Sequence, residues 1–160
     1  MNQFEGNVKI EDVLETQKFF AGTTRGVSMY PMLRHRRDTI VIKPLEGRLK
    51  KFDVPLYKNN GRYVLHRVIK VLPDAYIIRG DNLINKEYVT DDMILGKLDE
   101  FYRNPKDVSK IKSTDAKPVN MNGFKYKLYV RTMHYSFPIR FSYRKCRNLL
   151  GRIKRKIMSK

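Results

Sequence analysis

Three short strings of the sequence contain the residue types of an activated serine. Ser28 lies in Gly-Val-Ser-Met-Tyr-Pro-Met-Leu, His66 lies in Val-Leu-His-Arg-Val, and Asp81 lies in Gly-Asp-Asn. A hydroxyl, an imidazole and a carboxylate can act together as nucleophile, proton acceptor and orienting group. We therefore interpret Ser28 and His66, with an acid, as a candidate hydrolytic site, and the chain as a candidate serine peptidase.

The residues around Ser28 restrict its backbone. Gly26 reaches conformations that other residues avoid, and Pro31 fixes its own φ and favours an extended Tyr30. This pattern predicts that Ser28 lies at a constrained strand end, where its hydroxyl can be exposed. Tyr30 replaces the second glycine of Gly-x-Ser-x-Gly, which excludes the nucleophile elbow of α/β-hydrolases.

His66 lies within a run of β-type residues, 63–72. On a strand with period two, His66 shares a face with Val64 and Val68. One interpretation is a base that accepts the Ser28 proton, for which a neutral imidazole is suited near pH 7. The other is a half-buried histidine that is satisfied by a backbone carbonyl.

Together the strings resemble the signal peptidase I and LexA-type serine peptidase superfamily, over about residues 13–102. The nucleophile box of that superfamily matches Gly26, Ser28, Met29, Pro31 and Leu33, and Gly-Asp-Asn matches its third box. Val-Leu-His-Arg-Val resembles the histidine-base variant found in endoplasmic reticulum and archaeal signal peptidases. The resemblance implies a β-rich peptidase fold with Ser28 as nucleophile, a histidine base at the position of His66, and no cofactor or metal.

The acid that would orient the histidine has two candidates. Asp81 occupies the Gly-Asp-Asn position, whereas the histidine-type enzymes place another acid several residues later, where Glu87 is the nearest match. Either carboxylate could orient the imidazole. A turn residue that caps its own loop is the alternative role of Asp81.

The length of 160 residues allows one domain of moderate size. A helical pattern begins at Ile10, with Gly22 placed to end it, and short β-type runs follow at 38–43, 53–57, 63–72, 75–79 and 93–102. Asn60-Gly61 predicts a hairpin whose loop exceeds two residues. We expect a mainly β peptidase-like domain with its N-terminal helix at 1–102, a polar linker at 103–123 and a basic helical tail at 124–160.

The tail carries most of the positive charge. The chain has a net charge of +18, and residues 124–160 hold 12 of the 34 Lys and Arg residues and no acid. Apolar residues recur there at helical spacing: Ile139, Tyr143, Cys146, Leu150, Ile153 and Ile157. A basic amphipathic helix can bind an anionic membrane surface or a partner protein, and nucleic acid is less favoured because an apolar stripe has no use on a phosphate backbone. The stripe could also pack on the β domain.

The cysteine and histidine content gives no sign of an internal disulfide or a metal centre. The single Cys146 excludes an internal disulfide, and three scattered His residues lack metal-ligand spacing. Neither a membrane-spanning run nor a secretory signal is evident. We expect a cytoplasmic protein, with peripheral binding to the inner face of a membrane as an option.

The sequence therefore predicts a serine endopeptidase that cleaves a peptide or protein precursor through Ser28 and His66. The competing interpretation is a non-catalytic module of the same fold that binds a peptide segment or, through its basic charge, nucleic acid.

Overall fold

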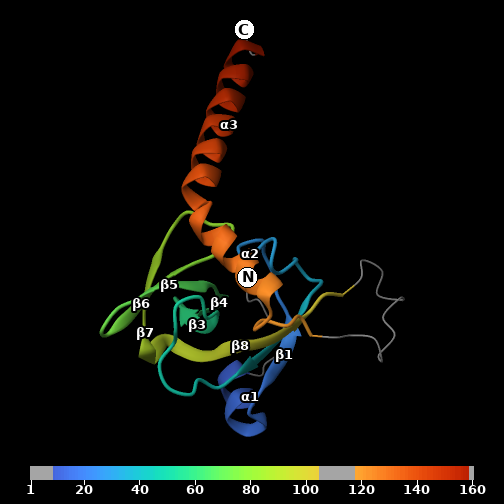
Figure 1. The fold of residues 1–160 in the computed structure, drawn as a ribbon, viewed down its shortest axis with the longest axis vertical. Coiled ribbons are helices and arrows are strands. Elements are labelled where there is room, and N and C mark those ends of the chain that lie inside the picture. The colour runs from blue at the N-terminus through green and yellow to red at the C-terminus, as the bar shows by residue number, and fades with distance from the viewer. Residues whose placement is uncertain (1–8, 105–117, 159–160) are drawn as a thin grey trace.

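The computed structural model describes residues 9–104 and 118–158, and the strands of this part form two antiparallel sheets (Figure 1). A helix precedes the sheets and two helices follow them, so the expected mainly β fold with a helix at each end is confirmed. The elements in chain order are α1 (Ile10–Gln17), β1 (Phe20–Thr23), β2 (Thr39–Lys43), β3 (Pro55–Asn59), β4 (Arg62–Leu65), β5 (Arg67–Val71), β6 (Ala75–Arg79), β7 (Glu87–Thr90), a 3-10 turn η1 (Asp91–Met93), β8 (Ile94–Tyr102), α2 (Phe124–Tyr135) and α3 (Phe137–Met158).

The larger sheet has the strand order β1-β2-β8-β3-β4, and the smaller sheet has the order β5-β6-β7. The hairpin between β3 and β4 turns on Asn60 and Gly61 alone, with φ values of 49° and 73°. The loop is therefore the two-residue type, shorter than the sequence suggested. Polar Asn59 and Arg62 extend the strands on either side, because an exposed hairpin end needs no apolar side chains.

The predicted strand 63–72 is divided at His66, which differs from the sequence expectation. Before His66 the chain pairs with β3 in the larger sheet, and after it Arg67 pairs with Arg79 of β6 in the smaller sheet. The backbone stays extended on both sides, so the residue pattern gives no sign of the change of partner. His66 thus lies at the junction of the two sheets.

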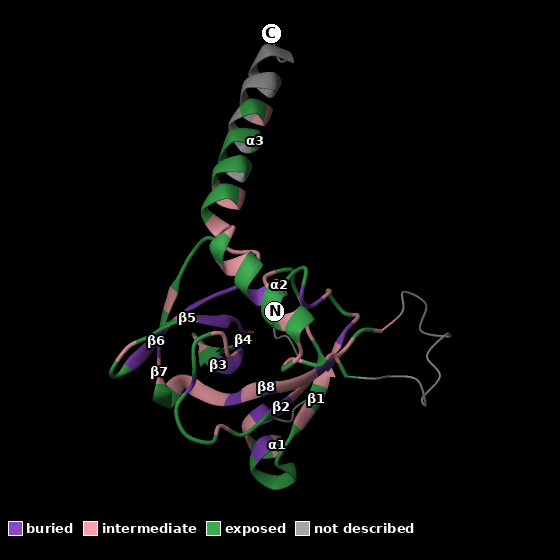
Figure 2. Ribbon diagram, in the orientation of Figure 1, coloured by how far each residue is buried: buried purple, intermediate pink, exposed green. Residues whose placement is uncertain are grey.

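Two hydrophobic cores lie on opposite sides of β3. Leu56 belongs to a first core beneath α1, and the adjacent Tyr57 belongs to a second core between the sheets. Alternation along the strand explains this division. Figure 2 shows buried segments on strands of both sheets and on α1 and α2. The first core comprises Ile10, Leu14, Met29, Met32, Leu33, Ile40, Ile42, Val54, Leu56, Leu65, Leu98 and Phe101.

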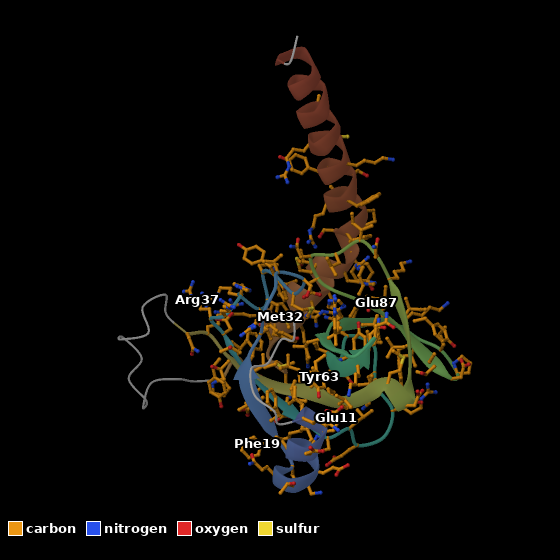
Figure 3. All side chains as sticks on the ribbon, turned by 180° about the vertical axis from the view of Figure 1, so that it is seen from behind. Glu11, Phe19, Met32, Arg37, Tyr63 and Glu87 are labelled. Atoms are coloured by element: carbon orange, nitrogen blue, oxygen red, sulfur yellow. The ribbon has the colours of Figure 1, made fainter. Side chains whose placement is uncertain are left out.

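The N-terminal helix is shorter than the position of Gly22 suggested. α1 ends at Gln17, and Lys18 adopts a left-handed conformation with φ 63°. The next residues form β1, which pairs with β2. Glu11 of α1 accepts hydrogen bonds from Tyr63 of β4 and Lys58 of β3, so the helix is held to the sheet by its polar face as well as by Ile10 and Leu14 (Figure 3).

The helical tail consists of two helices divided at Ser136. Pro138 is the second residue of α3, where its missing N–H is tolerated, but it could not continue α2. α2 packs on the first core through Tyr126 and Tyr129, whereas α3 projects from the body (Figure 1). No helix among the described residues is long and apolar enough to cross a membrane.

Of the predicted linker 103–123, residues 105–117 lie outside the described residues, as do residues 1–8 and 159–160 of the two flanking predicted segments. Where the chain is described again, Pro118 pairs with Tyr102, and the N–H of Val119 donates to the carbonyl of Phe101 at 2.8 Å. The segment that leads into α2 is therefore attached to the end of β8.

Candidate active site

Ser28 lies in the loop between β1 and β2, and buried side chains fix this loop. Gly26 has φ +101°, a conformation that favours glycine, and its N–H donates to Nδ1 of His35 at 2.7 Å. Met29 is buried in the first core with the next apolar residues of the loop, whereas Pro31 is exposed and follows a cis peptide bond. Ser28 itself is half-buried and lies in a turn of this loop, whereas its neighbours predicted a strand end.

The loop after β6 holds the Ser28 loop from the other side. The N–H of Asn82 donates to the carbonyl oxygen of Ser28 at 2.8 Å, and Nδ2 of Asn82 donates to the carbonyl of Val27 at 3.1 Å. A Cβ added to Gly80 would lie 2.8 Å from Ser28 O and 3.1 Å from both Cδ2 and Nε2 of His66. Only glycine fits between them, so the Nε2 edge of His66 and the Ser28 backbone meet at Gly80.

Ser28 and His66 line one small cavity of about 40 Å³. Its other walls are Thr24, Arg25, Gly26, Met29, Leu33, Val64 and Leu65. Among the residues that the structure describes, no hydrogen bond joins the Ser28 hydroxyl to His66. Catalytic hydrogen bonds are often long before substrate binds, and a serine hydroxyl can rotate about one bond, so shared access to the cavity is the informative observation.

Glu87 orients the His66 ring. Nδ1 of His66 donates to Oε1 of Glu87 at 2.8 Å, and the other carboxylate oxygen accepts hydrogen bonds from Tyr57 OH at 2.8 Å and Asn59 Nδ2 at 3.2 Å. Tyr57 OH also lies 3.1 Å from Nδ1. Because Nδ1 carries the proton toward Glu87, Nε2 has a free lone pair on the Ser28 side.

The electrostatic surroundings keep His66 neutral. Burial lowers the pKa of His66 below its ordinary value of 6.5, and the Glu87 carboxylate offsets part of this effect. Burial and the hydrogen bond to Glu87 raise the pKa of Tyr57, so its hydroxyl stays protonated and donates. Near pH 7 the site therefore combines a neutral imidazole with a fixed tautomer, which is the state of a general base.

Asp81 has a different partner. Its carboxylate accepts hydrogen bonds from Nε and Nη2 of Arg67, each at 2.8 Å, and from Tyr129 OH at 3.1 Å. The structure thus brings Glu87 to His66 and brings Asp81 to Arg67. Both members of the second pair are buried, and the pair joins the start of β5 to the loop that contacts Ser28 and to α2.

Sequence reasoning missed the residues that hold the acid. Tyr57 and Asn59 come from β3, and Glu87 begins β7, a strand that the sequence did not indicate. From the sequence, Tyr57 is interpreted as a core aromatic residue, and nothing in its spacing connects it with Glu87, 30 positions later. Alternation was the available signal, because Tyr57 and Asn59 share one face of a strand.

No cluster of three or more His, Cys, Asp or Glu side chains that could hold a metal ion occurs in the part of the chain that the structure describes. Comparisons with known proteins find no matching family model and no matching curated protein.

Proposed function

We propose that this protein is a serine endopeptidase of the signal peptidase and LexA type that cleaves a peptide or protein precursor. Ser28 is the nucleophile, His66 is the general base, and Glu87 orients His66. The observation that carries the proposal is the pairing of Glu87 with Nδ1 of His66, which leaves Nε2 free beside Gly80 and the Ser28 backbone, while Ser28 and His66 line one cavity. The two-sheet β fold and the order of the three strings add support.

In the first half of the reaction, Nε2 of His66 takes the proton of the Ser28 hydroxyl while Oγ attacks a peptide carbonyl carbon. The resulting tetrahedral oxyanion needs hydrogen-bond donors, and the backbone N–H of Ser28, for which no acceptor is found among the described residues, is the candidate donor. His66 then gives its proton to the leaving amine, and the C–N bond breaks to give an acyl-enzyme.

In the second half, water attacks the ester carbonyl and loses a proton to Nε2. Collapse of this second tetrahedral intermediate releases the new carboxyl terminus and returns the proton to Oγ of Ser28. The Glu87 carboxylate stabilises the imidazolium that forms in both halves, through the hydrogen bond to Nδ1.

The test is mass spectrometry of a peptide library prepared from a proteome digest and incubated with the purified full-length chain. We expect new peptide termini with wild type and none with Ser28→Ala or His66→Ala. Thr16→Ala, which removes an exposed hydroxyl on α1, is the matched control and is expected to cleave as wild type does. Identical products from wild type and Ser28→Ala would contradict the enzyme assignment and favour a peptide-binding module.

A further inference from the structure

The helix α3 exposes a row of large apolar side chains. Ile139, Tyr143 and Leu150 are 74%, 66% and 66% exposed, and Cys146 between them is exposed as well. The side chains of Ile153 and Ile157, which continue the row in the sequence, lie outside the described residues. Because α3 projects from the body and these side chains are exposed, the described part of the row does not pack on the β domain (Figure 1).

The charge around this row has one sign only. Residues 124–160 contain 12 Lys and Arg residues and no Asp or Glu. By helical spacing, basic residues such as Lys145 and Arg147 fill the circumference that the apolar row leaves. A long helix with an apolar row, whose charged residues are all cationic, matches a surface that is anionic outside and apolar beneath.

We infer that α3 binds flat on an anionic lipid surface, with Ile139, Tyr143 and Leu150 inserted at the boundary between headgroups and acyl chains. Charge complementarity identifies the occupant, because Lys and Arg bind anionic headgroups while the apolar row enters the acyl boundary. An RNA or DNA backbone would use only the charges. This inference does not depend on whether Ser28 is a nucleophile.

The N-terminal end of α3 is held to the β domain near the candidate active site. The guanidinium of Arg79 lies 3.4 Å from the ring centroid of Phe137, and Nη2 of Arg140 donates to the carbonyl oxygen of Asp81 at 3.1 Å. Asp81 belongs to the loop that contacts Ser28. A lipid-bound α3 therefore holds the β domain, and the Ser28 cavity with it, at a defined position beside the membrane.

The absence of Trp from the chain allows a direct test with Tyr143→Trp as a single fluorescent reporter. The full-length variant is mixed with vesicles of phosphatidylcholine alone, or with about one third phosphatidylserine. We expect flotation with the anionic vesicles, a blue shift of the Trp emission and quenching by brominated lipid. Binding should be at least about tenfold stronger to anionic than to neutral vesicles, and weaker at high salt.

Two matched controls separate insertion from adhesion. Tyr88→Trp, at an exposed residue of β7 in the otherwise wild-type chain, should show no blue shift when the same vesicles bind. The double variant Ile139→Ser/Leu150→Ser should lose most of the binding, whereas Phe19→Ser/Val71→Ser, at exposed apolar positions of the β domain, should keep it. No flotation, equal binding to both vesicle types, or binding without a blue shift at position 143 would overturn the inference; tight binding to RNA in place of vesicles would do the same.

Discussion

The two carboxylates near the candidate site should respond in opposite ways to neutral replacement. Asp81→Asn is expected to destabilise the fold, because Asp81 neutralises a buried guanidinium. Arg67 is 2% exposed and Asp81 is 8% exposed, with two 2.8 Å hydrogen bonds between them. Glu87→Gln is expected to leave the fold nearly unchanged and to lower kcat strongly.

The magnitude for Asp81 follows from burial. Loss of one partner of a buried ion pair costs about 3–5 kcal/mol, since the other charge stays in the interior without compensation. That is a large share of the ~5–15 kcal/mol by which most domains are stable. For a domain of this size it corresponds to a fall in Tm of about 6–20 °C.

The magnitude for Glu87 follows from its exposure and its partner. The side chain is 24% exposed, so water can solvate a Gln amide there, and we expect a loss of only about 1 kcal/mol in the free energy of unfolding. The amide can donate to Nδ1 of His66 and so moves the ring proton to Nε2. His66 then cannot accept the Ser28 proton, and kcat should fall by about 10²- to 10⁴-fold.

The assay pairs urea and thermal denaturation with cleavage of a peptide identified in the library experiment, for wild type, Asp81→Asn and Glu87→Gln. Activity of Asp81→Asn is measured below its transition temperature, so that loss of fold is not read as loss of chemistry. An Asp81→Asn protein as stable as wild type, together with a Glu87→Gln enzyme of wild-type kcat, would refute the assignment of the two acids.

Three further predictions concern pH and close packing. Cleavage should fall as the pH drops through the lowered pKa of His66, at a pH below 6.5. In Glu87→Gln this acid limb of the remaining activity should move to lower pH, because the carboxylate that raises the pKa of His66 is gone. A pH–rate profile measures both effects. Gly80→Ala should abolish cleavage in a folded protein, since its Cβ would lie 2.8 Å from Ser28 O and 3.1 Å from His66 Nε2, and wild-type kcat in this variant would contradict the geometry. Burial alone would raise the pKa of Glu11, but hydrogen bonds from Lys58 and Tyr63 lower it from 4.5 to about 2. The contribution of Glu11 to stability is therefore complete above pH 4.5 and is lost as the pH falls toward 2. Urea denaturation across that pH range should show that acid lowers the free energy of unfolding less in Glu11→Gln than in wild type.

The sequence alone determined the features that depend on local spacing. Period-two runs placed most of the strands, Asn60-Gly61 marked a hairpin, and the apolar row at steps of three and four predicted the C-terminal helix. The restricted backbone around Ser28 could also be predicted from Gly26 and Pro31, although the predicted strand end is a loop in the structure. These properties are set by residues close together in the chain, so they need no knowledge of the fold.

Only the tertiary structure decided which acid meets the histidine. Asp81 and Glu87 were equivalent in the sequence, and the pairing of β6 with β7 places Glu87 beside His66 while the turn after β6 sends Asp81 toward Arg67. The division of one β-type run at His66 was invisible for the same reason, since an extended backbone looks alike in either sheet. Contacts between residues 14 to 30 positions apart depend on strand order, and local residue preferences do not encode strand order.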